Sequence, residues 1–408
     1  MSQAVETVHD SSRRSGSAVE RARAFVERHV APVALELDGR HDPRESFSWE
    51  LIEAAHSYGL ATLCLDGQYG GEGLDFPTFI RVGVELAKGD LGIAAMIVQT
   101  NRLGVMLQTC GTPEQRERYL SGIVADPRCL LAFCQSEPHL GSDSGLPVNS
   151  GPHRTRYHTR AVREGDDWVL TGKKIYIDNG ATAKYYLVMA QTDDDAPTNR
   201  GTTCFVLEGG MPGLNPGQVF DKTGERLAMH AEVNFDGVRL TDAHVIGEVN
   251  RAHAVHALFT STRNVTAAST ALGVAEAAYD CALSYARERV QGGRHLIDHG
   301  AVRVDLARLR MEIDAASAYV HATAAAAAGS EPIGKAAGIY PKVVAGEAAW
   351  SAAQLAVDLH GARGYTRGWQ AEKLLRDALS FGHAGTPTRT AMLKAAKALY
   401  GDPEPLVL

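Results

Sequence analysis

The chain lacks the sequence features of a membrane, secreted or nucleic-acid-binding protein. No apolar run in its 408 residues approaches the roughly 18 residues that a membrane-spanning helix needs, and its polar start has no signal-peptide core. The six cysteines are scattered without a Cys-x-x-Cys pair, so we expect buried thiols. Forty-one basic and 48 acidic residues give a formal net charge of −7, which provides no electrostatic surface for nucleic acid. We therefore expect a cytoplasmic protein.

Common nucleotide-binding and hydrolase motifs are also absent. The sequence contains no Gly-x-Gly-x-x-Gly after a predicted strand, no P-loop, no Gly-x-Ser-x-Gly turn and no His-Glu-x-x-His zinc motif. His295 and His299 have a spacing that could chelate a metal from a helix, but no third ligand is evident nearby. We therefore expect no metal site.

The pattern of apolar residues divides the chain into three regions behind a short tail. The composition, 45% apolar and 22% charged, is that of a globular protein, and 408 residues suggest two or three domains. Residues 1–16 form a polar tail, 17–127 and 248–408 have mostly helical periodicity, and 128–247 contain short strand-like runs. Helices, then strands, then helices exclude a doubly wound sheet and predict an α+β multidomain fold.

The helical regions carry recognisable start signals. Ser17 and Ser48 precede apolar residues at spacings of three and four, and Pro77 and Pro113 suit the first turns of two further helices. Three long helices are predicted in the C-terminal region, over 265–290, 301–328 and 333–359.

The middle region reads as an all-β domain, a barrel or a sandwich. Runs of β-branched, aromatic and aliphatic residues alternate there with Gly, Asp, Asn and Pro. The predicted strands cover 130–135, 168–171, 174–178, 185–191, 203–207 and 232–235.

Two segments of the middle region carry a specific resemblance. Phe133 to Asp143 reads Phe-Cys-Gln-Ser-Glu-Pro-His-Leu-Gly-Ser-Asp and resembles the first signature of the acyl-CoA dehydrogenase superfamily. Gly172 to Gly180 resembles that family's Gly-x-Lys-x-Trp-Ile-Thr-Asn-Gly segment. Further family-like segments follow in order over about residues 17 to 400, at 69–73, 111–120, 287–291, 360–365 and 376–377 with 385–386.

The resemblance implies both a fold and an activity. The fold is a helical N-terminal domain, a middle β-barrel and a C-terminal four-helix bundle, assembled as a homotetramer. The activity is that of an FAD-dependent oxidoreductase on an acyl thioester, carried by CoA or by an acyl carrier protein. An electron-transfer partner or O₂ would take up the electrons.

The resemblance also implies flavin contacts in the middle region. Flavin chemistry needs a pocket for the ring, donors at its N1/O2 edge, and donors or cations for the pyrophosphate. Phe133, Gln135, Ser136 and Ser142 would line the FAD. Tyr176 stands where the family has a Trp that covers the flavin, although an ordinary barrel aromatic is the alternative.

More implied FAD contacts lie on both sides of that region. Asp178 replaces a Thr that sits near flavin N5. Arg289 matches an arginine that reaches the pyrophosphate across a subunit interface; without the resemblance it would be a charge at a helix C-terminus. Gln291 replaces a hydroxyl donor. The remaining implied contacts are Asp358, Gly361 and Ala362, near a neighbouring subunit's FAD, and Thr386 and Thr388, near the adenosine end.

Two basic features suggest substrate contacts. Arg263 aligns with an arginine that the family uses along the pantetheine channel, a solvated helix charge being the alternative. An insertion after residue 143 would place Arg154, Arg156, His158 and Arg160 on one face if it formed a strand. That face would be either an anion site, for CoA phosphates or an acidic carrier protein, or a solvated hairpin.

The usual catalytic base of the resembled family is missing. Its glutamate in Glu-Gly-Thr removes the α-proton while hydride leaves Cβ, but here Ala384 precedes Gly385-Thr386. A second known location, in the helix near residue 260, holds Thr262 and no carboxylate within one turn. Because loss of a general base costs typically ~10²–10⁴ in rate, we expect a displaced base, with Asp178 and His383 as the candidates.

Three functional hypotheses follow from these residues. The first is an oxidoreductase on an acyl thioester that uses the displaced base. The second is a flavin-dependent monooxygenase or oxidase of the same fold, which would not need the glutamate. The third is a non-catalytic subunit whose partner chain supplies the glutamate.

Overall fold

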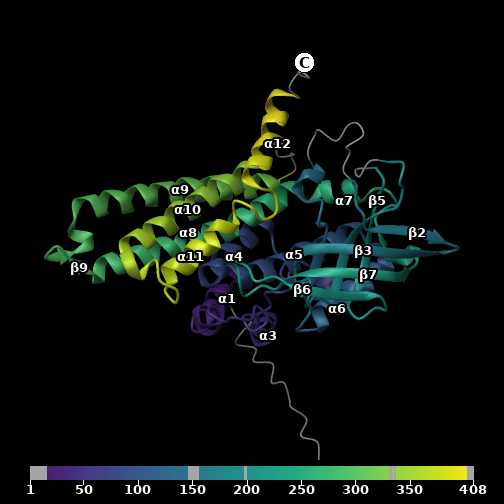
Figure 1. Ribbon diagram of the computed structural model, residues 1–408, viewed down its shortest axis with the longest axis horizontal. Coiled ribbons are helices and arrows are strands. Elements are labelled where there is room, and N and C mark those ends of the chain that lie inside the picture. Colours follow the sequence, from purple (N-terminus) through teal and green to yellow (C-terminus); the bar gives the residue numbers. More distant parts are fainter. Residues whose placement is uncertain (1–15, 146–155, 197–199, 330–333, 335–336, 402–408) are drawn as a thin grey trace, which may run out of the picture.

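The computed structural model describes residues 16–145, 156–196, 200–329, 334 and 337–401. Helices, then strands, then helices follow one another in these residues, and the helical bundle and the sheet lie at opposite ends of the molecule (Figure 1). The fold is thus the predicted one: a helical N-terminal part, a β-sheet middle part and a helical C-terminal part. The tail expected at residues 1–16 lies almost wholly outside the described residues.

Most helices of the N-terminal region share one apolar core, while apolar side chains between residues 103 and 123 pack against the sheet in a second core. The Ser17 hydroxyl accepts from the backbone N–H of Glu20, and the Glu20 carboxylate accepts from the Ser17 N–H, so the predicted cap is confirmed as a capping box. Ser48 caps the next long helix through Leu51 N–H. The helices are α1 (Ala18–Phe25), the π-helix Val26–Val30, α2 (Ala34–Asp38), α3 (Trp49–Ser57), α4 (Phe76–Gly89), α5 (Leu91–Cys110) and α6 (Pro113–Ala125).

The middle region forms one eight-stranded mixed sheet. Its two halves, β6-β7-β3-β2 and β4-β5-β8 with β1 added to β4, meet at the single pair Arg160–Gln191. In the described residues β6 and β8 do not pair with each other, so hydrogen bonds do not close the expected barrel. The strands are β1 (Leu131–Cys134), β2 (Arg160–Glu164), β3 (Asp167–Asp178), β4 (Tyr185–Gln191), β5 (Thr202–Glu208), β6 (Leu214–Val219), β7 (His230–Leu240) and β8 (Val245–Ile246).

Two strand predictions need correction. The runs 168–171 and 174–178 belong to the single strand β3, because β7 pairs along both and absorbs the irregularities as register shifts. The insertion forms no strand over Arg156 to Thr159; β2 begins only at Arg160, and the His158 ring stacks on His139 at 3.5 Å. The proposed common basic face therefore does not form there, and Arg154 lies outside the described residues.

The C-terminal region is a bundle of long helices. Small residues allow them to approach closely: a side chain at Gly273 in α8 would collide with the Val84 carbonyl of α4, and one at Gly83 with Ser269. These contacts fix α4 against the bundle and so place α5, which follows it, beside α8. The helices are α7 (Ala252–Leu258), α8 (Thr260–Glu288), α9 (Gly300–Ala328), α10 (Tyr340–His360), α11 (Gln370–Ser380) and α12 (Thr388–Tyr400), with a hairpin of β9 (Val290–Gln291) and β10 (Arg294–His295) after α8.

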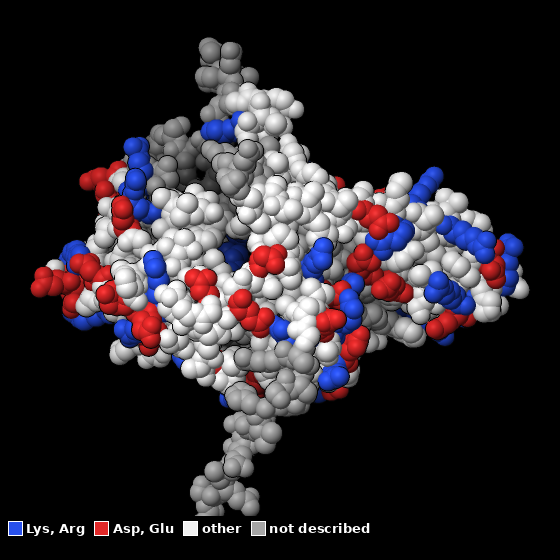
Figure 2. Space-filling model, turned by 180° about the vertical axis from the view of Figure 1, so that it is seen from behind, with Lys and Arg blue, Asp and Glu red and all other residues white. Residues whose placement is uncertain are grey.

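Surface charge and helix composition characterise the described residues. Acidic and basic side chains are interspersed on the face seen in Figure 2, without a broad basic area. Among the described residues, no helix combines the length and the apolar character that crossing a membrane requires. The described residues also contain no group of three or more His, Cys, Asp or Glu side chains that could hold a metal ion.

Candidate active site

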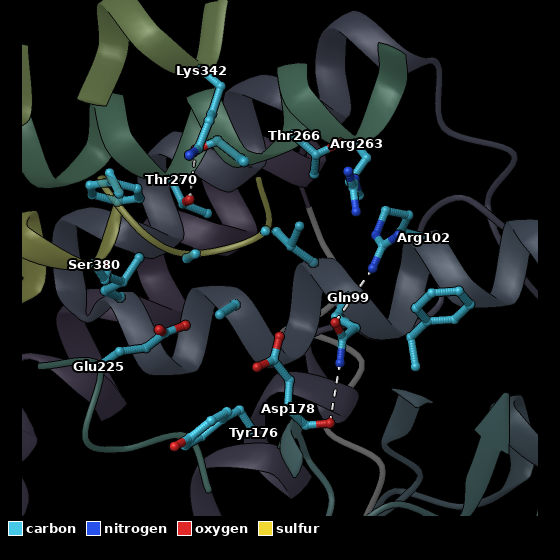
Figure 3. A pocket seen from close by; sticks show the side chains of 18 of the residues that line it. Gln99, Arg102, Tyr176, Asp178, Glu225, Arg263, Thr266, Thr270, Lys342 and Ser380 are labelled. Atoms are coloured by element: carbon cyan, nitrogen blue, oxygen red, sulfur yellow. Dashed lines mark hydrogen bonds between the residues drawn. The ribbon is translucent and has the colours of Figure 1, made fainter. Parts of the chain in front are cut away.

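A cavity of about 260 Å³ lies where the three regions meet. Its wall comes from α5, the ends of β1 and β3, the loop before β7, and helices α8, α10 and α11 (Figure 3). The lining residues include Leu91, Ala95, Val98, Gln99, Arg102, Phe133, Gln135, Ser136, Tyr176, Asp178, Glu225, Arg263, Thr266, Thr270, Lys342, Ser380, Ala384 and Gly385.

A second cavity of about 490 Å³ adjoins the first. The two share part of their walls, so they form neighbouring parts of one site. The shared residues are Ser136, Tyr176, Asp178, Glu225, Ser380, Ala384 and Gly385. The second cavity adds Ser142, Lys222, Thr223, Gly224, His230, Arg376, Leu379, His383 and Pro387.

Two side-chain amides hold the strand ends that form the cavity wall. Asn179 Nδ2 donates to the Leu131 carbonyl at 2.9 Å and so fixes the end of β3 to β1. Gln99 Nε2, from α5, donates to the carbonyls of Leu131 (3.3 Å) and Asp178 (3.4 Å). The predicted residues Phe133, Gln135 and Ser136 are thereby brought to the wall of the first cavity.

Tyr176 presents an aromatic face to both cavities. Its backbone has φ +55°, and β3 shifts its register against β7 between Lys174 and Ile177. The ring packs on Phe220 with centroids 4.5 Å apart, yet 60% of the residue stays exposed. Tyr176 is therefore an exposed aromatic on the cavity wall, and its contact with the flavin stays a prediction.

Glu137 and Lys174, one from each sequence motif, form a buried ion pair that anchors this wall. Lys174 Nζ lies 2.8 Å from Glu137 Oε1, with both side chains almost wholly buried, and also donates to the Gln135 carbonyl at 3.1 Å. The N–H groups of His158 and Thr159 donate to the same carboxylate. Burial alone would raise the pKa of Glu137, but Lys174 and these hydrogen bonds bring it below its usual value.

Asp178 reaches the cavity but already has a histidine partner. His230 Nε2 of β7 lies 2.7 Å from Asp178 Oδ1. Burial alone would raise the pKa of Asp178, but the attraction and hydrogen bonding of His230 lower it to about 2. Asp178 is therefore an ionised carboxylate with little tendency to accept a proton.

Glu225 is a second carboxylate on the same wall. Its backbone, at φ +56°, donates its N–H to Asp377 Oδ1 of α11 at 2.7 Å, and its carbonyl accepts from Lys222 Nζ. The carboxylate is buried and lies 4.0 Å from His230 Nε2. Burial raises the pKa of Glu225, with Lys222 and His230 opposing that rise in part.

Three cations line the side of the first cavity opposite Glu225 (Figure 3). Arg263 Nη2 donates to Thr386 Oγ1 at 3.0 Å, and Lys342 Nζ donates to the Thr386 carbonyl. Arg102 Nη2 lies 3.4 Å from Gln99 Oε1. Burial, together with the nearby Arg263 charge, lowers the pKa of Arg102 to about 10 and that of Lys342 to about 8.

Residues 384–386, which we aligned with the family's Glu-Gly-Thr from the sequence, lie at the junction of the cavities. Ala384 is on the wall of both, while Thr386 is buried beneath the cations. His383 is exposed and lines the second cavity but not the first. Thr388 lines a separate groove at the start of α12. The structure thus brings Asp178 to both cavities and His383 only to the second.

The remaining predicted FAD contacts lie at the other end of the bundle. Arg289 and Gln291 are at the β9 hairpin, far from the sheet (Figure 1). Asp358, Gly361 and Ala362 lie close to the same end, because His360 stacks on Tyr285 of α8 at 3.8 Å. A single chain therefore does not bring these residues to the cavities.

The sequence reasoning missed most of the charged residues of the site. Gln99 and Arg102 interrupt the apolar run of α5, and Lys342 stands in the Ala- and Val-rich start of α10; these interruptions were available signals. Glu225 had no comparable signal, because a Thr-Gly-Glu-Arg loop usually reads as a solvated turn. The missed residues include Gln99, Arg102, Lys222, Glu225, His230, Thr266, Thr270 and Lys342.

Three family patterns together match most of the chain. The pattern described as "Acyl-CoA dehydrogenase, N-terminal domain" matches residues 16–126, the middle-domain pattern matches 132–238, and the C-terminal-domain pattern matches 253–399. Together they extend over all three regions of the fold.

Individual relatives give the same result. The short-chain-specific acyl-CoA dehydrogenase of Megasphaera elsdenii is 32% identical over 362 residues, 88% of this chain and 90% of that protein. Cyclohex-1-ene-1-carbonyl-CoA dehydrogenase of Syntrophus aciditrophicus is 28% identical over 97% of this chain and 92% of its own length. The structure of butyryl-CoA dehydrogenase from Megasphaera elsdenii superimposes with a TM-score of 0.86 at 28% identity, covering 98% of this chain and 100% of that one.

The wall that the two cavities share suits the family's cofactor. The cavities are contiguous, and the exposed face of Tyr176 offers a flat apolar surface to a conjugated ring. Gln135, Ser136 and Ser142 provide polar groups along the same wall, as a flavin requires. From its domains, its relatives and this site, the chain belongs to the acyl-CoA dehydrogenase family, as an acyl-CoA dehydrogenase-like oxidoreductase with FAD as its cofactor.

Proposed function

We propose that the protein oxidises an acyl thioester, carried by CoA or by a carrier protein, with a base other than a residue at position 384. One observation carries this proposal. Ala384 lies on the wall of the cavity without a carboxylate, while the buried carboxylate of Glu225 lies on the wall of the same cavity. The site thus contains a carboxylate, that of Glu225, although residue 384 is an alanine.

The bound FAD would supply an acceptor for two electrons. Gln135, Ser136, Ser142 and Tyr176 would hold it against the sheet. The protein's own task is then to orient the thioester, exclude water and take the α-proton. That proton is too weakly acidic to leave without a positioned base.

Glu225 fits the role of base better than the two residues expected from sequence. Asp178 is held by His230 with a pKa of about 2, which makes it a weak proton acceptor. His383 is exposed and reaches only the second cavity. Burial raises the pKa of Glu225, and a base works best when its pKa is near the working pH. We therefore propose Glu225 as the proton acceptor and retain Asp178 and His383 as rivals.

The test is anaerobic reduction of the flavin by an acyl-CoA, followed by stopped-flow absorbance. Glu225→Gln should slow reduction by about 10²–10⁴-fold, and Glu225→Asp should retain part of the rate. Reduction by the unaltered protein should also slow as the pH falls through the pKa of Glu225, because the protonated carboxyl cannot accept a proton.

Matched variants separate the rivals. Asp178→Asn and His383→Ala should leave FAD bound, and His383→Ala should leave the reduction rate within a few-fold. If His383→Ala or Asp178→Asn abolishes reduction while Glu225→Gln does not, the base is misassigned. If no acyl thioester reduces the flavin of the unaltered protein, the proposed function itself is wrong.

We also propose that the protein is a homotetramer in which one subunit completes the FAD site of another. Arg289, Gln291 and the segment from Asp358 to Ala362 lie together, away from the cavities of their own chain. Helix α12 projects from the body (Figure 1) with exposed Met392, Leu393, Leu399 and Tyr400. Such an apolar face suits an interface.

Sedimentation and FAD retention test this assembly. The protein should sediment as a tetramer at micromolar concentration, and Arg289→Ala should weaken FAD retention without unfolding the chain. A monomer that retains FAD would contradict the assembly.

We propose that the reduced protein passes its electrons to an electron-transfer protein or to O₂. The rate at which each acceptor reoxidises the reduced flavin distinguishes the two.

A further inference from the structure

The first cavity contains cations that no carboxylate of the described chain neutralises. The side chains of Arg102 and Arg263 point toward one another across a short gap on the cavity wall (Figure 3). Within the described residues neither of them, nor Lys342, lies within 4.0 Å of an acidic side chain. Asp178 attracts Arg102 from a greater distance, but its carboxylate is in contact with His230.

This arrangement departs from how the chain treats its other buried cations. Arg21, Lys174, Arg226 and Lys373 are buried, and each contacts a carboxylate. Lys342, with 3% of its surface exposed, donates to the Thr386 carbonyl and contacts no carboxylate of the described residues. A buried charge without a counter-ion is costly, so such a group is retained when a ligand completes it.

We propose that this cavity binds an acyl thioester whose acyl group itself ends in a carboxylate, held by Arg102 and Arg263 with Lys342 nearby. The inference rests on the proposed function, since it names the substrate class of the same site. A guanidinium binds a carboxylate through two parallel hydrogen bonds, and two converging guanidinium groups can share one carboxylate.

The position and lining of the cavity favour a carboxyacyl group over other anions. Arg263 and Lys342 are both fixed to Thr386, two residues beyond Ala384, where this chain lacks an acid. A ligand carboxylate would supply the negative charge there. The same cavity of about 260 Å³ is lined by Leu91, Ala95 and Val98, which suit a short methylene chain and not a nucleotide phosphate.

Binding of chain-matched thioesters to the holoprotein tests this inference. Succinyl-CoA is compared with butyryl-CoA, and adipyl-CoA with hexanoyl-CoA, by calorimetry, which needs no turnover. The carboxylate-bearing member should bind at least about tenfold more tightly, as expected for charge-assisted hydrogen bonds. Arg102→Met should remove most of that preference, Arg102→Lys should keep part of it, and Arg81→Met, on the exposed face of α4, should keep all of it.

The two proposals can fail separately. Equal affinity within each pair, or a preference that survives Arg102→Met, overturns the carboxylate site even if every thioester reduces the flavin. A preference lost in Arg102→Met supports the site even if flavin reduction is absent, in which case only the proposed oxidation is wrong. If Arg102→Met does not fold, the paired thioesters are compared on the unaltered protein and on Arg102→Lys. A preference for the carboxylate-bearing member that Arg102→Lys reduces supports the carboxylate site, and equal affinity within each pair overturns it.

Discussion

Two clusters of buried charge lie close together in this protein and are built in opposite ways. At the junction of the three regions, Lys373 Nζ lies 2.7 Å from Asp90 and 2.6 Å from Asp377, while Arg376 contacts Asp38. We call these five residues the junction cluster. In the first cavity, by contrast, Arg102 and Arg263 face one another and Lys342 lies apart from them, and none of the three contacts an acidic side chain in the described chain.

The difference separates charges that hold the fold from charges that await a ligand. In the junction cluster burial alone would lower the pKa of Lys373, yet Asp377 and Asp90 raise it above its ordinary value. In the cavity nothing offsets burial, and the pKa of Lys342 falls to about 8. Completing a charge with protein carboxylates stabilises the chain itself, whereas leaving it incomplete reserves the interaction for a bound anion.

Breaking the junction cluster should have the largest effect on stability. Lys373→Met leaves Asp90 and Asp377 buried without their cation, and should lower the free energy of unfolding by about 3–5 kcal/mol. Urea unfolding followed by circular dichroism measures this. Arg40→Met, which removes an exposed pair with Glu36, is the control and should cost at most about 1 kcal/mol. Equal effects of the two changes would show that the junction cluster is not structural.

Breaking the ion pair of the two motifs should have a slightly smaller effect. Lys174→Met should cost about 3 kcal/mol at pH 7, at the lower end for a buried pair, because Glu137 keeps two N–H donors. The pKa of Glu137 is lower in the folded than in the unfolded protein. This difference stabilises the folded state at pH values above the pKa of the unfolded chain, and the contribution is lost as the pH falls through the folded pKa. The difference in the free energy of unfolding between the unaltered protein and Lys174→Met should therefore narrow toward pH 4. A constant difference would contradict the assignment.

Lys342 should make the stability of the protein depend on pH in an alkaline range. Its pKa is about 8 in the folded protein against 10.5 ordinarily, so between these values the unfolded chain binds more protons. The stability of the unaltered protein should therefore rise from pH 8 to 10.5, by about 2 kcal/mol relative to Lys342→Met. Parallel unfolding curves at each pH measure this difference. An unchanged difference over that range would show that the lysine is already compensated.

The smallest effect on stability is expected in the cavity itself. Arg102→Met strands no carboxylate, so its free energy of unfolding should stay within about 1 kcal/mol of the unaltered protein, or exceed it. Thermal unfolding without ligand, compared with Lys174→Met, gives the contrast. A loss as large as that of Lys174→Met would mean that Arg102 has a structural partner.

Local sequence signals predicted those elements that depend on neighbours along the chain. The Ser17 capping box, the Ser48 cap and strand β4 at 185–191 are set by short-range hydrogen bonds and by an unbroken apolar run. Strands β2 and β6 escaped prediction because their burial is low and β6 contains Pro and Gly. They are strands because β3 and β7 pair with them.

The candidate site divides in the same way. The residues Gln135, Ser136 and Tyr176 could be chosen as candidates because each lies within a short motif of consecutive residues. Glu225 was not, because its place depends on a hydrogen bond to Asp377, 152 residues away.

The sequence by itself determined the family, the order of helices and strands, and the presence of an alanine at position 384. These are properties of consecutive residues, and the chain displays them before it folds. The tertiary structure alone decided which charges are paired. Lys373 and Arg102 look alike as isolated basic residues in helices, but folding brings carboxylates to the first and a second arginine toward the other. Whether a charge is compensated depends on distances across the fold, and the order of residues along the chain does not give these distances.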